Sequence, residues 1–151
     1  MKYIVGLGNY SMGDDSIGIR VVEHIAQQGL ETGFQALNIS CQPLNLVTYL
    51  NENTEAMVIV DCLKTGKRPS DWILFTPEQV ATQKELAGFS THEGDALKTL
   101  ELFKAAGYSL PKVRILGIEP QSLEVNTDLS PSLESRLPEY VQLAIREIES
   151  M

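Results

Sequence analysis

Short apolar runs alternate along the chain with stretches in which apolar residues recur every three or four positions. The runs are typical of buried strands and cover residues 3–8, 34–39, 56–61, 72–75 and 112–118. The helical spacing is seen in Ile17, Val21, Val22 and Ile25, in Leu44, Val47 and Leu50 after Pro43, between residues 96 and 103, and between residues 131 and 148. Strands that alternate with helices predict an α/β fold, in which helices pack on a mostly parallel sheet.

One connection between predicted strands is too short to hold a helix. Residues 64–71 form a polar turn, whereas a parallel neighbour needs a crossover of about a dozen residues or more. The run at 72–75 is therefore expected to return antiparallel, as an edge strand. No repeat, low-complexity tract or linker interrupts the pattern, so we expect a single domain over residues 1–151.

Capping residues mark where several helices begin and end. Thr76–Gln79 has the cap, the proline and the glutamine of a helix start, and Ser90–Glu93 is a second capping box. Gly29 and Gly107 are expected to end helices. Pro138 is expected to begin a new turn in the C-terminal helical region or to kink it.

Three side chains able to bind a metal ion follow predicted strands. Asp15 lies in the loop after the first strand, Asp61 ends the third strand, and His92 follows the edge strand and its helix. Ligands of parallel sheets bind beyond the carboxyl ends of the strands, so we expect these side chains to converge there. If Ser90 caps a helix, the helix dipole keeps the imidazole of His92 neutral, which is the form that binds metal. Two oxygen ligands and one histidine suit a divalent first-row metal ion.

Each of the three residues also has a plainer explanation. Asp15 precedes a helix and could serve only as its N-cap. Asp61 could only form a turn after its strand, and His92 could belong only to a helix start. The choice between these explanations stays open for each residue taken alone.

The first loop does not favour a nucleotide site. A dinucleotide fingerprint beginning at Gly6-Leu7-Gly8 would need a third glycine where Ser11 stands, and no Gly-Lys-Ser/Thr motif follows. Asp14 and Asp15 would also repel a diphosphate. We therefore expect no nucleotide cofactor.

The composition is that of an acidic globular protein. Its 151 residues include 20 Asp and Glu against 12 Lys and Arg, which gives a formal net charge of −8. Nucleic acids and anionic membranes both attract basic surfaces, so neither is expected as a partner. Cys41 and Cys62 stand apart, outside any CxxC pattern, and are expected to be buried thiols rather than ligands. Without a signal-peptide pattern or a membrane-length apolar run, the chain is expected to be soluble and cytoplasmic.

Several motifs occur in a fixed order over almost the full chain. They are Gly6-x-Gly8-Asn9, Gly13-Asp14-Asp15-x-x-Gly18, a strand ending in Asp61, Ser90-x-His92, Gly117-Ile118-Glu119-Pro120 and Leu129-Ser130-Pro131. Together they resemble the hydrogenase maturation proteases, which trim the large subunit of nickel–iron hydrogenases. The resemblance implies a three-layer sandwich with a twisted five-stranded sheet, mostly parallel, between helices.

The resemblance also implies an activity and a site. Family members are endopeptidases that remove a short C-terminal extension from a large-subunit precursor that already carries nickel. The family's three metal-contacting positions fall on Asp15, Asp61 and His92, which we expect to be catalytic as well. The nickel would be supplied by the precursor, which is the expected partner, and we expect the protein itself to be a monomer.

One segment departs from the family pattern. Many members carry a Gly-Gly-Thr-like segment after the second strand, where this chain has Ser40-Cys41-Gln42. That segment is thought to help place the substrate. Which hydrogenase this protein serves therefore stays open.

Two mechanisms and two rival functions remain open. The water that attacks the scissile carbonyl could be activated by the metal as a Lewis acid or by a carboxylate as a general base. A non-catalytic scaffold that checks nickel in the immature subunit would use the same residues. A magnesium-binding, receiver-like signalling domain would need a lysine at the end of its last strand, where Glu119 and Pro120 stand instead.

Overall fold

A mixed β-sheet forms the centre of the molecule, in a computed structural model that describes residues 1–79, 90–91 and 96–151. The strands are β1 (Lys2–Leu7), β2 (Gln35–Ser40), β3 (Ala56–Lys64), β4 (Trp72–Phe75), β5 (Ser90–Thr91) and β6 (Lys112–Ile118). The helices are α1 (Ile17–Gln27), α3 (Ala96–Ala105), α4 (Pro131–Glu134) and α5 (Leu137–Glu149), and the 3-10 helices are η1 (Gly13–Ser16) and η2 (Pro43–Tyr49). Within these described residues, no helix is both long and apolar enough to cross a membrane.

The order of the strands confirms the predicted sheet. The main sheet runs β2-β1-β3-β6-β4, and the first four strands of this order pair in parallel. β4 pairs antiparallel with β6 and lies at the edge, as the short connection before it predicts. The two residues of β5 pair antiparallel with the end of β3, outside this path.

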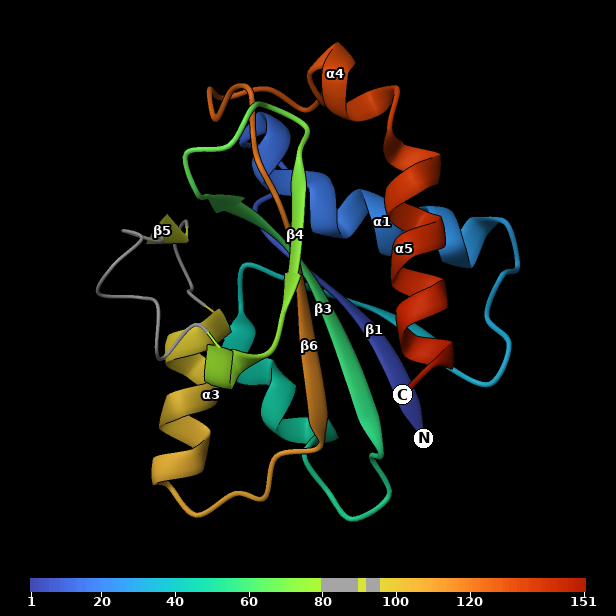
Figure 1. The fold of residues 1–151 in the computed structure, drawn as a ribbon, viewed down its shortest axis with the longest axis vertical. Coiled ribbons are helices and arrows are strands. Elements are labelled where there is room, and N and C mark those ends of the chain that lie inside the picture. Colours follow the sequence, from blue (N-terminus) through green and yellow to red (C-terminus); the bar gives the residue numbers. More distant parts are fainter. Residues whose placement is uncertain (80–89, 92–95) are drawn as a thin grey trace.

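Helices cover both faces of the sheet and make three layers (Figure 1). Alternate residues of β3 point to opposite faces, because side chains alternate along a strand. Val60 and Cys62 belong to the core that packs beneath α1 and α5, whereas Ile59 and Leu63 belong to the core shared with η2 and α3. The α/β sandwich with a mostly parallel sheet is therefore confirmed.

Most of the predicted helix boundaries are confirmed. Gly29 and Gly107 follow α1 and α3 with positive φ angles of 64° and 91°, the backbone that glycine adopts most easily. Thr76 and Gln79 form the expected capping box, because each backbone amide donates to the other residue's side-chain oxygen. Pro138 lies in the first turn of α5, so it begins a new helix after α4.

The helix after Pro43 differs from its prediction. η2 is a 3-10 helix with about three residues per turn, which places Pro43 and Leu46 on the same buried side. Leu44, which was expected to face the core, is 58% exposed. The tighter helix therefore buries a different side from the one that the α-helical spacing predicts.

Two predicted boundaries near the sheet's carboxyl end are wrong. β3 does not end at Asp61 but continues to Lys64, because β5 pairs with its last two residues. Ser90 belongs to β5 and Thr91 continues the strand, so Ser90 is not a helix cap. His92 lies outside the described residues.

Candidate active site

The predicted carboxylates lie at the carboxyl end of the parallel strands. Asp15 belongs to η1, which follows β1, and Asp61 belongs to the central strand β3. Both are buried, with exposed fractions of 2% and 7%. The structure thus places two of the three predicted site residues where the rule for parallel sheets predicts them.

The glycine-rich loop sets the position of Asp15. The backbone amide of Asn9 donates to Asp15 Oδ2 at 2.9 Å, and the side-chain oxygen of Asn9 accepts from the amide of Ser11 at 3.0 Å. Gly8 has a φ of 136°, and a Cβ at this position would lie 1.9 Å from the carbonyl oxygen of Asp15. Glycine is therefore required here for the loop to close against η1.

The plainer explanation of Asp15 as a helix cap is not supported. The N-cap position of α1 is occupied by Ser16, and no side chain caps that helix. Asp15 lies one residue earlier, inside η1, and its carboxylate accepts a hydrogen bond from the preceding loop. Its position follows from the loop rather than from the end of the helix.

Asp61 is held by its own strand. Its Oδ1 accepts the backbone amide of Cys62 at 2.8 Å, and the alternation along β3 puts its side chain on the face of Ile59 and Leu63. Cys62 points to the opposite face and is 1% exposed. Cys41 is exposed, so the prediction of a buried thiol is confirmed for Cys62 and wrong for Cys41.

Four carboxylates contribute to the electrostatic surroundings of the buried Cys62 thiol. Burial raises the pKa of the Cys62 thiol far above its ordinary value, because a thiolate is poorly solvated there. The negative charges of Asp15 and Asp61 raise this pKa further, and those of Asp14 and Glu119 do so as well. The charges of four carboxylates, from β3, η1 and the residue after β6, thus all disfavour the thiolate form of Cys62.

The third predicted ligand lies outside the described residues. No group of three histidine, cysteine, aspartate or glutamate side chains within residues 1–79, 90–91 and 96–151 is arranged to hold a metal ion. Asp15 and Asp61 supply oxygen donors only, and the role of His92 stays a prediction.

Asp14 has a structural role that the sequence did not reveal. Its fully buried carboxylate accepts four hydrogen bonds of 2.7 to 2.9 Å. They come from the backbone amides of Gln121, Ser122 and Ser130 and from the hydroxyl of Ser130. Asp14 thus ties η1 to the segment that joins β6 to α4. The sequence shows two adjacent aspartates, Asp14 and Asp15. Their spacing alone does not reveal that Asp14 anchors the loop whereas Asp15 belongs to the candidate site.

Glu119 has a comparable role on the other side of the site. Its buried carboxylate accepts the amide and the hydroxyl of Thr65 at 2.7 and 3.0 Å, and the amide of Gly66 at 3.3 Å. The segment after β3 is therefore fixed by the residue that follows β6. The glutamate of the Gly117–Pro120 motif acts here as an anchor.

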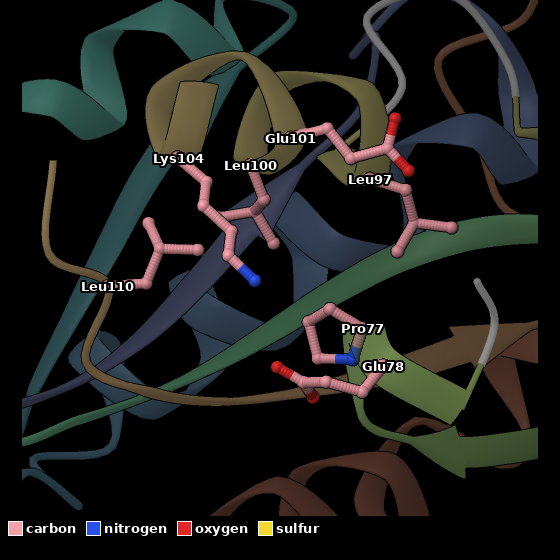
Figure 2. A pocket seen from close by; sticks show the side chains of 7 residues that line it. All are labelled: Pro77, Glu78, Leu97, Leu100, Glu101, Lys104 and Leu110. Atoms are coloured by element: carbon pink, nitrogen blue, oxygen red, sulfur yellow. The ribbon is translucent and has the colours of Figure 1, made fainter. Parts of the chain in front are cut away.

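Two hollows lie away from these carboxylates. A groove of about 520 Å³ includes part of Ser40-Cys41-Gln42, the segment that departs from the family pattern. The residues that line it are Cys41, Gln42, Pro43, Leu44, Asn45 and Thr99. A smaller pocket of about 120 Å³ lies between α3 and the residues after β4 (Figure 2). Its lining residues are Pro77, Glu78, Leu97, Leu100, Glu101, Lys104 and Leu110. Neither hollow includes Asp15 or Asp61.

Sequence comparisons point to one family. The family model described as HycI, hydrogenase maturation protease, matches residues 19–147. The hydrogenase 2 maturation protease of Escherichia coli K12 is 26% identical over 152 residues, covering 95% of this chain and 90% of its own length. The hydrogenase expression/formation protein HupD of Rhodobacter capsulatus is 24% identical over 149 residues, covering 97% of this chain and 70% of its own.

Solved structures share the fold. The maturation protease HybD of Thermococcus kodakarensis superposes with a TM-score of 0.81 at 20% identity, covering 97% of this chain and 98% of its own. The maturating endopeptidase HybD of E. coli superposes with a TM-score of 0.80 at 20% identity, covering 99% and 92%. The family match covers most of the chain, and the chain therefore belongs to the hydrogenase maturation protease family.

Proposed function

We propose that this protein is an endopeptidase that removes the C-terminal extension of a nickel-loaded hydrogenase large-subunit precursor in the cytoplasm. Membership of the maturation protease family supports hydrolysis of a protein substrate. The observation that carries the proposed site is the burial of Asp15 and Asp61 at the carboxyl end of the sheet, where both charges act on Cys62. The family match does not support the alternative of a magnesium-binding, receiver-like signalling domain.

The nickel of the precursor is the proposed ligand of this site. Asp15 and Asp61 carry the oxygen donors, and each carboxylate is oriented by a backbone amide, of Asn9 and Cys62 respectively. A cation brought by the substrate would offset the repulsion between the buried carboxylates. His92 is the proposed third ligand. Cleavage would then depend on nickel already being present in the precursor.

Two chemical routes fit this arrangement. The nickel held by the precursor could act as a Lewis acid on the scissile carbonyl, or a carboxylate could remove the proton from the attacking water. Both routes add water to the carbonyl and release the C-terminal extension as a peptide. Both make Asp15, Asp61 and His92 the catalytic residues.

The proposal is tested with purified nickel-loaded precursor and the variants Asp61→Ala and His92→Ala. We expect each variant to lower the rate of extension removal by about a hundredfold or more. Asp128→Ala and His24→Ala are controls of the same residue types outside the proposed site, and they should cleave at the wild-type rate. Full-rate cleavage by both site variants would refute the proposed site.

A second measurement separates the protease from a non-catalytic scaffold. In a cell that lacks this protein, mass spectrometry should find a hydrogenase large subunit that keeps its C-terminal extension. Purified wild-type protein should then shorten that isolated precursor. A scaffold would bind the precursor but leave its mass unchanged.

A further inference from the structure

The end of β3 and the loop that follows it concentrate positive charge in an acidic protein. We call residues 64–71 the basic loop: it contains Lys64, Lys67 and Arg68, and all three side chains are exposed. These are 3 of the 12 Lys and Arg residues in a chain whose net charge is −8. The basic loop therefore carries positive charge in a protein whose net charge is negative.

Both ends of the basic loop are tied to Glu119, the residue that follows β6. Glu119 accepts the three hydrogen bonds from Thr65 and Gly66, and its backbone carbonyl accepts the amide of Ser70 at 2.8 Å. The amide of Glu119 in turn donates to the carbonyl of Asp71 at 2.8 Å. Both ends of the loop are thus held by a single residue.

Ser70 of the loop is also tied to Tyr140 of α5 and to Arg136, which precedes that helix. The Ser70 carbonyl accepts the hydroxyl of Tyr140 at 2.6 Å and the guanidinium of Arg136 at 2.9 Å. Ser70 has a φ of 74°, a conformation that is costly for a residue with a side chain and that these contacts maintain. The loop is therefore held in one shape by contacts that do not involve its cationic side chains.

The ion pairs of the described residues involve the carboxylate of the basic loop but not its cationic side chains. Asp71, its only acidic residue, forms an ion pair with Arg136 at 3.5 Å. Within the part of the chain that the structure describes, Lys64, Lys67 and Arg68 form no ion pair through their side chains. A fixed loop that neutralises its carboxylate and exposes its cations presents a defined positive surface.

The basic loop lies at the same end of the sheet as the candidate active site. Figure 1 shows the connection from β3 to β4 at the end of the sheet where η1 and the segment before α4 lie. Lys64 is three residues beyond Asp61 in the same strand, which corresponds to about 10 Å. A positive rim thus borders a buried cluster of carboxylates.

We propose that the basic loop is a docking surface for an acidic segment of the hydrogenase precursor. This inference rests on the proposed function and adds to it. The buried carboxylates attract the metal-bearing part of the substrate and repel acidic side chains, whereas the basic loop attracts those side chains. The two opposite charges thereby orient the precursor on the enzyme.

A protein segment fits this surface better than a nucleic acid. Nucleic-acid binding needs an extended basic face that follows the phosphate backbone. The basic loop is short, and the rest of the chain carries an excess of carboxylates. The charge pattern matches a short acidic peptide next to a cationic centre.

The test measures the affinity of fluorescently labelled precursor for the wild type and for Lys67→Glu/Arg68→Glu. Lys112→Glu/Arg146→Glu is the control, because it changes the same residue types and the same total charge at two exposed positions outside the loop. We expect the loop variant to raise the Kd about tenfold at low ionic strength. The difference should shrink as salt increases, since salt screens surface charges. The control should stay within about twofold of the wild type.

The outcomes distinguish this inference from the proposed function. Equal affinities of the loop variant and the control, or no binding of the precursor to the wild type, would overturn the docking surface. So would an oligonucleotide that competes with the precursor for the loop. Charge-dependent binding without any cleavage by the wild type would support the docking surface and refute the protease. Cleavage by the wild type, together with equal affinities of the loop variant and the control, would support the protease and refute the docking surface.

Discussion

Two adjacent aspartates of the first loop have different surroundings. Asp14 is fully buried and accepts four hydrogen bonds from the segment before α4. Asp15 faces the loop that contains Asn9 and lies among the carboxylates near Cys62. The difference arises because successive residues of a tight helical turn point in different directions. Asp14 is therefore a structural anchor, and Asp15 is the proposed ligand.

At this scale we predict the effect of Asp14→Ala on stability. The substitution removes a charged acceptor and leaves buried amides without a partner, so it should lower the free energy of unfolding by about 3 kcal/mol. Urea denaturation followed by circular dichroism measures the change.

The control is Asp128→Ala, which removes an exposed carboxylate. It should change the free energy of unfolding by less than about 0.5 kcal/mol. Equal stabilities of the two variants would show that the contacts of Asp14 do not stabilise the fold.

At the scale of elements, the start of α1 lies against the backbone of two strands. A Cβ at Gly18 would lie 2.1 Å from the carbonyl oxygen of Val60 in β3 and 2.5 Å from that of Leu7 in β1. These atoms belong to the backbone of the sheet, which cannot move aside as a flexible side chain can. The helix therefore approaches the sheet closely because residue 18 has no side chain.

We predict that Gly18→Ala moves α1 away from the sheet. The substitution should lower the free energy of unfolding by about 3 kcal/mol or more, because the added methyl group overlaps the strand backbone. It should also lower the cleavage rate, since α1 follows directly after η1 and Asp15. Denaturation and cleavage assays test both effects.

Gly29→Ala provides the comparison for this prediction. A Cβ at Gly29 would meet no atom within 4 Å, but the φ of 64° would disfavour alanine. Its expected cost is about 1 kcal/mol from the backbone alone. A loss at Gly18 no larger than at Gly29 would contradict the close contact.

The elements were predictable from the sequence where local patterns determine them. The apolar run of β4, together with the short polar turn before it, correctly predicted an antiparallel edge strand. The extension of β3 past Asp61 was not predictable, because it depends on pairing with β5. The anchoring of Asp14 depends on partners at positions 121 to 130, which no local pattern connects to it.

The same distinction applies to the candidate site. The placement of Asp15 and Asp61 was predictable, because Asp15 follows β1 and Asp61 lies near the carboxyl end of β3, and these ends meet at one end of a parallel sheet. The supporting roles of Asp14 and Glu119 were not, since they arise only when distant segments pack together. His92 lies outside the described residues, so its role stays a prediction.

At the scale of the whole molecule, stability should depend on alkaline pH through Cys62. Its thiol has a pKa raised above the unfolded value of 9.0, first by burial and then by the surrounding carboxylates. The unfolded chain therefore loses this proton at a lower pH than the folded protein does. The contribution to stability is complete below pH 9.0 and is lost as the pH rises above it.

We predict that the wild type loses stability above pH 9.0 more steeply than Cys62→Ala does. The difference in slope should approach about 1.4 kcal/mol per pH unit, which corresponds to one proton. Chemical denaturation at a series of pH values measures it. Cys41→Ala retains Cys62 and should keep the wild-type slope; identical slopes for all three proteins would contradict the role of Cys62.

The hydrogen bonds of Asp14 also bear on the order in which the chain is made. They join residue 14 to residues that lie 107 to 116 positions later. On the ribosome, β1, α1 and β3 emerge long before Ser130, so the Asp14 carboxylate lacks these hydrogen bonds during most of synthesis. The contacts that join η1 to the segment before α4 form only when the last quarter of the chain has emerged. The nascent protein therefore acquires its candidate active site near the end of translation.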